Sequence, residues 1–228
     1  MTKLSERIVQ VEALQYLRNR YRRGARGGKI FAQTEVRTRK EYGGKRADGL
    51  IVFRHWWSGV VVVAIEAKSS KTLPSMKPTL KIWRLLWNCI RAGFLIAILM
   101  GAAFVFYKVD DPTAQLLIPL NTFVVGAIMY GILTRNNYAH YDVPVLKQLR
   151  QYPGHEQWLA FSKDSLQAIS RTKHKNLVKL CKDCGYGMMS VAPNGRIRIE
   201  VKAKRYRSWW DNPLSYYATE DEIRKVIN

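Results

Sequence analysis

A chain of 228 residues is long enough to bury a proper core, either as one large domain or as a smaller domain with an insertion. Its 38 Lys and Arg residues against 17 Asp and Glu residues give a formal net charge of +21, so acidic partners are expected, either nucleic acid or an anionic membrane surface. The three cysteines, Cys89, Cys181 and Cys184, argue against a disulfide framework and for a reducing compartment. The charged N-terminus shows no cleaved secretory signal, so synthesis is expected to begin and remain in the cytoplasm.

The first predicted element is an amphipathic helix over residues 4–21, where apolar side chains recur at three- and four-residue steps. The helix ends in a basic run broken by glycines, RYRRGARGGK, at residues 20–29. This basic run is expected to hold nucleic-acid phosphates or lipid headgroups, with a merely solvated loop as the alternative. Its cationic side chains, predicted to bind nucleic acid, are Arg20, Arg22, Arg23, Arg26 and Lys29.

Three β-strands are predicted next, over residues 30–38, 48–54 and 60–68. The last two are separated by HWWSG, a five-residue connection with a glycine, which is typical of a hairpin. A meander of three antiparallel strands therefore follows the first helix.

Two long apolar segments then interrupt the pattern, at about 85–107 and 114–133, within a region that runs with its linkers from 73 to 150. Each is long enough to cross the hydrocarbon of a bilayer, and the short KVDDPT connection makes them a hairpin. Basic residues crowd both outer flanks while Asp110 and Asp111 lie in the connection, so both flanks are expected in the cytoplasm. A pair of core helices in a soluble domain is the alternative, which Arg91 and Asn121 keep open.

After the hairpin, the sequence again predicts the short strands and helices of a globular domain. A short strand is predicted at 156–162, a helix at 164–182, and a second β-hairpin across the PNG turn at 193–195. The remainder, 205–228, is a basic and aromatic tail with a terminal helix.

The stretch VVVVAIEAKSSKT at residues 60–72 carries the strongest sign of a functional site. Its apolar beginning indicates a strand that is buried on both faces, yet the strand ends in Glu66 and Lys68. Buried charges cost several kcal/mol unless they are paired or hold a metal. If Arg54 pairs with Val60 across the hairpin, Asp48 lies opposite Glu66, and Lys68 lies on the same face.

Two carboxylates at cross-strand distance repel each other unless a cation lies between them, and oxygen ligands suit Mg²⁺ or Mn²⁺. A lysine beside them can orient or deprotonate water and neutralise charge that develops on a phosphate. These residues can hydrolyse phosphodiesters. A purely structural cluster of Asp48, Glu66 and Lys68 is the alternative.

Asp48 in KRADGLIVF, followed one hairpin later by Glu66-Ala67-Lys68, resembles the PD-(D/E)XK, or restriction-endonuclease-like, nuclease superfamily. Ala47 stands where the name-giving pattern has proline. The resemblance covers residues 2–71 and about 157–202, and it implies an α/β fold of helix, three-stranded meander, helix and further strands, interrupted here by the transmembrane hairpin. It also implies that Asp48 and Glu66 bind the metal, that Lys68 serves the attacking water, and that Glu12 of the first helix joins the site.

Two further candidates are weaker than this site. Cys181 and Cys184 form half of a zinc site or pack against the core at a helix end, and the second reading is favoured because no further CxxC exists. Glu35 either assists the metal or forms an outward salt bridge.

The sequence thus predicts a membrane-anchored, divalent-metal-dependent nuclease with its core in segments 1–72 and 151–204 and both termini in the cytoplasm, at a bacterial inner membrane. DNA and the lipid bilayer are the expected partners, with a second copy of the chain or other components of a membrane system as further ones. Defence against foreign DNA and DNA processing at the membrane are both consistent roles. A non-catalytic membrane tether that binds nucleic acid or a protein is the alternative.

Overall fold

The computed structural model describes residues 4–72, 79–107, 111–135, 137, 140–206 and 212–228. The chain forms two compact units. We call residues 1–78 together with 143–228 the core unit, and residues 79–142 the hairpin unit.

The core unit is built on a mixed sheet of six strands in the order β1-β2-β3-β6-β7-β8. The first three strands form an antiparallel meander, β6 and β7 run parallel to β3, and β8 returns antiparallel at the edge. The strands are β1 (Ala25–Arg37), β2 (Arg46–His55), β3 (Gly59–Lys68), β6 (Glu156–Ser162), β7 (Gly187–Val191) and β8 (Ile197–Val201).

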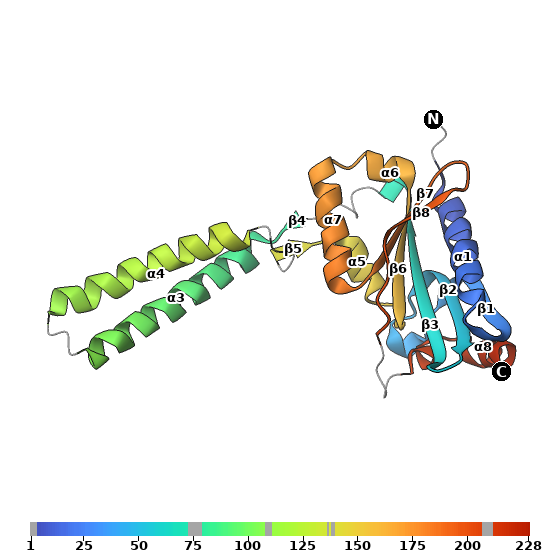
Figure 1. Ribbon diagram of the computed structural model, residues 1–228, viewed down its shortest axis with the longest axis horizontal. Helices are drawn as coiled ribbons and strands as arrows, with labels where there is room; N and C mark the ends of the chain where they lie inside the picture. Colours follow the sequence, from blue (N-terminus) through green and yellow to red (C-terminus); the bar gives the residue numbers. More distant parts are fainter. Residues whose placement is uncertain (1–3, 73–78, 108–110, 136, 138–139, 207–211) are drawn as a thin grey trace. The chain divides into compact units, whose positions relative to one another are not determined.

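Helices cover both faces of this sheet (Figure 1). On one face lies α1 (Glu6–Arg22), whose buried Val9, Ala13 and Leu17 pack against alternate residues of β2, β3 and β6. The other face carries four short helices, and their apolar residues form two further clusters with the sheet. These helices are α5 (Pro144–Leu149), α6 (Lys163–Gln167), α7 (Arg171–Cys184) and α8 (Glu220–Ile227). Single 3₁₀ turns occur at η1 (Lys40–Tyr42), η2 (Ser70–Thr72) and η4 (Pro213–Tyr216).

The register of the β2–β3 hairpin is the one that the sequence predicts. Arg54 pairs with Val60, and the ladder runs to Gly49 opposite Ile65, one residue before Asp48 and Glu66. The strand β1 is longer than predicted because part of the basic run joins it. A bulge between Ala25 and Ile30 contains Gly27 and Gly28, both with positive φ, and this conformation suits glycine.

The parallel pair of β3 and β6 joins the two segments of the core unit. Val63 lies beside Glu156 and Lys68 beside Phe161, so the strand before the hairpin unit and the strand after it are direct neighbours. Both segments therefore fold into one sheet, although 87 residues separate Lys68 from Glu156 in the printed sequence.

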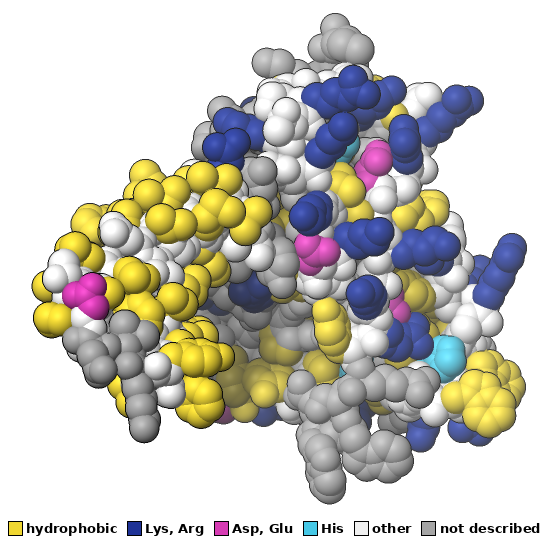
Figure 2. Space-filling model, turned by 60° about the vertical axis from the view of Figure 1, so that its left-hand side comes forward, with side chains coloured by type: hydrophobic (Ala, Val, Ile, Leu, Met, Phe, Trp, Pro, Cys, Tyr) yellow, Lys and Arg dark blue, Asp and Glu magenta, His cyan; other side chains and the backbone are white. Residues whose placement is uncertain are grey.

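The hairpin unit consists of two long apolar helices, α3 (Ile82–Phe106) and α4 (Pro112–Thr134). A two-stranded antiparallel ribbon joins the chain before α3 to the chain after α4, through β4 (Thr79–Leu80) and β5 (Tyr141–Asp142). Both helices are long and apolar enough to cross a membrane, and only 11% and 6% of their most apolar windows are buried. On the face shown in Figure 2, hydrophobic side chains cover much of this unit, whereas Lys and Arg side chains are spread over the core unit. Low burial argues against the alternative of two core helices, because a core helix would be largely covered.

Three boundaries differ from the sequence-based expectation. The predicted helix at 164–182 is two helices, α6 and α7, which are separated at Ala168–Ser170. The hairpin unit ends at residue 142 rather than 150, because Val145 and Leu149 of α5 are buried in the core unit. The C-terminal tail also belongs to the core unit, since Tyr217 bridges Thr38 beside β1 and its side chain is fully buried.

The two apolar helices approach closely at glycines. A Cβ on Gly93 would lie 2.5 Å from the carbonyl oxygen of Phe123, whereas a Cβ on Gly101 in the same helix would meet nothing within 4 Å. We therefore expect Gly93→Ala to separate α3 from α4 and to destabilise the hairpin by about 1–3 kcal/mol, a usual cost of overpacking. Thermal unfolding of the detergent-purified protein measures this, with Gly101→Ala as the matched control. Equal melting temperatures for the two variants would contradict the packing.

Candidate active site

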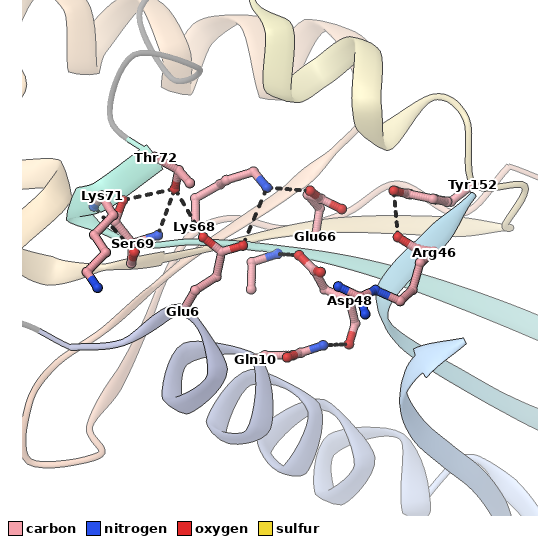
Figure 3. Close-up of polar contacts among 11 residues, drawn as sticks. Glu6, Gln10, Arg46, Asp48, Glu66, Lys68, Ser69, Lys71, Thr72 and Tyr152 are labelled. Carbon is pink, nitrogen blue, oxygen red and sulfur yellow. Dashed lines mark hydrogen bonds and ion pairs between the residues drawn. The ribbon is translucent and has the colours of Figure 1, made fainter. Parts of the chain in front are cut away.

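Asp48, Glu66 and Lys68, which we call the carboxylate–lysine cluster, lie together at one end of the sheet (Figure 3). Lys68 is the last residue of β3, Asp48 lies near the start of β2, and the first turn of α1 reaches the same place through Glu6. Glu66 has no exposed surface, Lys68 is almost covered, and Asp48 is half-buried. Asp48 is therefore the member of the cluster that is most exposed to solvent.

The ammonium of Lys68 lies between two carboxylates. Its Nζ is 2.6 Å from Oε1 of Glu66 and 3.8 Å from Oε1 of Glu6. The other oxygen of Glu6 accepts a hydrogen bond from the Thr72 hydroxyl at 3.2 Å, which ties the end of β3 to the first turn of α1.

The backbone around Asp48 holds its carboxylate in place. Oδ2 accepts a hydrogen bond from the amide of Ala67 at 2.8 Å, so the side chain spans from β2 to the residue between Glu66 and Lys68. The Gln10 side chain of α1 donates to the Asp48 carbonyl oxygen, and Tyr152 donates to the Arg46 carbonyl oxygen at 2.8 Å. Contacts from three separate segments thus position the start of β2.

Burial governs the electrostatics of the cluster. Desolvation, together with the charge of Asp48, raises the pKa of Glu66 to about 7 despite the attraction of Lys68. Desolvation also raises the pKa of Asp48, against the hydrogen bond from Ala67 and the charge of Lys68. Desolvation alone would lower the pKa of Lys68, but the carboxylates around it, Glu66 foremost, raise it overall. Lys68 therefore stays a cation at neutral pH.

One buried oxygen of the cluster has no hydrogen-bond partner among the described residues. Oε2 of Glu66 is buried and accepts no hydrogen bond, although such a group normally has one. Within the described part of the chain, no three His, Cys, Asp or Glu side chains stand close enough to form a metal cage. Magnesium needs no such cage, because it keeps several waters and binds through one or two carboxylates. Asp48 and the free oxygen of Glu66 are therefore the groups of this cluster that could hold a hydrated Mg²⁺ or Mn²⁺ ion.

The acidic residue of α1 that reaches the cluster is Glu6 and not Glu12. The Glu12 carboxylate lies near the turn between β7 and β8, where a Cβ on Gly195 would be 3.8 Å from its Oε2. The helical period explains the difference: Glu6 and Gln10 are four residues apart and share a face, whereas Glu12 lies about 200° further round from Gln10. The burial of Gln10 on this face appears only in the folded core, so no local signal in the sequence favoured Glu6 over Glu12.

The basic run lies at the other end of the sheet from the cluster. Ala25 pairs with His55 at the tip of the β2–β3 hairpin, and α1, with 17 residues, separates Glu6 from Arg22 by about 24 Å. Its five cationic side chains, Arg20, Arg22, Arg23, Arg26 and Lys29, are all exposed. Beside them, Trp56 and Trp57 project from the hairpin tip, and Trp57 is 90% exposed.

The weaker candidates take structural positions. Cys181 is buried in the core and Cys184 is half-buried at the end of α7, as expected for cysteines that pack at a helix end. Glu35 forms an exposed salt bridge with Arg46 at 3.5 Å. No protein-family model, curated protein or solved structure matches this chain, so the contacts described above are the basis for assigning the site.

The raised pKa of Glu66 makes the stability of the core unit depend on pH. Between the ordinary glutamate pKa of about 4.3 and about 7, the folded state holds a proton that the unfolded state has lost. The free energy of unfolding should therefore fall as pH rises through this window and be lowest above it. We expect Glu66→Gln to flatten this fall, while Glu12→Gln keeps the wild-type profile. Melting temperatures from pH 5 to pH 8 in EDTA test this, and parallel profiles for all three proteins would contradict it.

Proposed function

We propose that this protein is a membrane-anchored, divalent-metal-dependent nuclease that hydrolyses phosphodiester bonds in DNA. The observation that carries the proposal is the cluster at the end of β3, where Asp48, Glu66 and Lys68 meet and one buried oxygen of Glu66 has no partner. Asp48 and Glu66 would hold Mg²⁺ or Mn²⁺, which would supply Lewis-acid stabilisation of the phosphate and a more acidic bound water.

The protein residues have distinct tasks in this proposal. Because the carboxylates around Lys68 raise its pKa, its ammonium would donate hydrogen bonds and neutralise charge on the phosphate rather than take a proton from water. The bond from the Ala67 amide fixes Asp48 Oδ2 and leaves Oδ1 for a ligand. Glu6 and Gln10 act through these residues, as positioning groups that hold Lys68 and the start of β2.

The arrangement of elements supports the restriction-endonuclease-like fold as part of the proposal. A helix, a three-stranded meander and a parallel strand follow one another around the cluster, with α5 between β3 and β6. In that superfamily the residues at the positions of Asp48, Glu66 and Lys68 form the catalytic set, whereas Glu12 lies away from the cluster here.

The two exposed apolar helices are the basis for the membrane part of the proposal. Since β3 precedes them and its neighbour β6 follows them, both ends of a spanning hairpin must emerge on the same side of the bilayer. Lys81 and Arg135 cap the outer ends of α3 and α4, Arg84 lies in the first turn of α3, and all three would face the cytoplasm at a bacterial inner membrane. Asp111 caps α4 by accepting from the Thr113 amide at 2.9 Å, whereas Asp110 lies outside the described residues. Arg91, the tenth residue of α3, lies over the Trp87 ring at 5.4 Å.

A non-catalytic membrane tether is the second candidate, because Glu66 is fully covered and already paired with Lys68. The two functions differ in one property: a tether binds DNA without cleaving it.

Cleavage assays with purified protein separate these candidates. We expect Asp48→Asn, Glu66→Gln and Lys68→Met each to lower divalent-dependent cleavage by about 100-fold or more, while DNA binding persists because cations elsewhere hold the phosphates. Glu12→Gln is the matched control on α1 and should cleave as wild type does. Wild-type protein that binds DNA but never cleaves it with Mg²⁺ or Mn²⁺ would instead identify a tether.

Cysteine labelling tests the orientation. In a variant that lacks the three native cysteines, a single cysteine at Thr113 should react with a membrane-impermeant reagent applied from outside the inner membrane, whereas one at Ser5 should not. Labelling at the Ser5 position alone would show that the protein has the opposite orientation in the membrane. Release of the protein by carbonate without detergent would rule out the transmembrane hairpin.

A further inference from the structure

A basic cleft of about 740 Å³ lies in the core unit between α6–α7 and the β7–β8 hairpin. Four cationic side chains and only one carboxylate line this basic cleft. The cations are Lys163, Arg171, Arg196 and Arg198, and the carboxylate is Glu200. All four cationic residues are exposed, so the cleft presents positive charge to solvent.

Internal ion pairs neutralise little of this charge. Glu200 lies 3.3 Å from Arg198 and accepts a hydrogen bond from the Ser190 hydroxyl at 3.4 Å. Among the described residues, Lys163, Arg171 and Arg196 have no carboxylate partner. Nε2 of His174, which also lines the cleft, is buried with no hydrogen-bond partner in the described part of the chain. The three exposed cations, Lys163, Arg171 and Arg196, are suited to a polyanion, because each could contact a phosphate oxygen.

The strand register connects the basic cleft to the carboxylate–lysine cluster. Lys68 lies beside Phe161, Phe161 beside Ser190, and Ser190 beside Arg198, in one row across β3, β6, β7 and β8. Residues in such a row point to the same face, and three strand spacings are about 14 Å. Ser190 and Arg198 line the cleft, while α6 covers the buried Phe161 and carries Lys163 at its start.

This distance spans only a few phosphates of a DNA strand. One strand of a DNA duplex places a phosphate about every 3.4 Å along the helix axis, so 14 Å corresponds to about four phosphates. By contrast, the basic run lies at the opposite end of the ten-residue β3, about 30 Å from Lys68. A strand held in the cleft could reach the cluster, whereas one held only by the basic run would have to extend along the whole sheet.

We propose that the basic cleft holds the phosphate backbone of a DNA strand, with Arg171 and Arg196 as its principal contacts, beside the carboxylate–lysine cluster. The proposal rests on the nuclease function for its biological meaning, but the binding it describes does not require cleavage. It names substrate-binding residues that differ from those of the basic run.

The test measures binding of a short fluorescent DNA duplex by full-length protein carrying Asp48→Asn, across a range of salt concentrations. Arg171→Gln with Arg196→Gln removes two cleft charges. Lys173→Gln with Lys175→Gln removes two exposed charges from the same helix, outside the cleft, and Arg22→Gln with Arg26→Gln removes two from the basic run. We expect the cleft variant alone to reduce the slope of log affinity against log salt by about two, and to weaken binding about tenfold at low salt.

The alternatives give different results. The proposed role of the cleft is wrong if the cleft variant keeps the wild-type salt dependence of DNA binding. It is also wrong if the Lys173 and Lys175 control loses as much affinity as the cleft variant. Loss of binding to anionic lipid vesicles rather than to DNA also overturns it. If the salt slope of the cleft variant falls as expected but wild-type protein never cleaves DNA, DNA binding in the cleft is supported and the nuclease function is contradicted. If wild-type protein cleaves DNA and the cleft variant binds DNA as wild type does, the nuclease function is supported and DNA binding in the cleft is contradicted.

Discussion

The parallel pairing of β3 with β6 is the constraint on which the rest of this structure depends. It joins two segments of the chain that the hairpin unit separates, and it makes β3 a central strand with neighbours on both edges and helices on both faces. A strand in that position must be apolar along most of its length, and Val61 to Ile65 are fully or almost fully buried. Any charge at its end is consequently taken out of water, which gives Glu66 and Lys68 their unusual setting.

Burial at this strand end has two physical consequences that oppose each other. The ion pair with Lys68 favours the charged form of Glu66, whereas desolvation and the nearby Asp48 favour the protonated form and prevail. Such an arrangement is a poor way to stabilise a fold, because apolar residues of similar size would avoid the desolvation. Its presence at the end of a core strand is understandable if the charges serve a site, where a bound cation would relieve the repulsion between the two carboxylates.

The topology also separates two cationic regions that composition alone cannot distinguish. Of the 38 Lys and Arg residues, five belong to the basic run at one end of the sheet, beside the exposed Trp56 and Trp57, and four line the basic cleft at the other end. Only the cleft shares a sheet face with the cluster and lies within a few strand spacings of it. A surface with aromatic side chains beside arginines suits lipid headgroups as well as nucleic acid, so the two ends need not share one partner.

The sequence by itself determined the elements whose signals are local: the first helix, the β2–β3 register, the two apolar helices and the turn at 193–195. Alternation along two strands joined by a short turn fixes which residues face each other. Counting residue pairs from Arg54 and Val60 at the turn therefore brings Asp48 together with Glu66 and Lys68. Tertiary structure alone decided which face of α1 meets the sheet, and hence that Glu6 rather than Glu12 reaches Lys68. It also decided that β6 pairs with β3 and that Arg171 and Arg196 converge, because contacts between residues far apart in the chain depend on packing that no local pattern encodes.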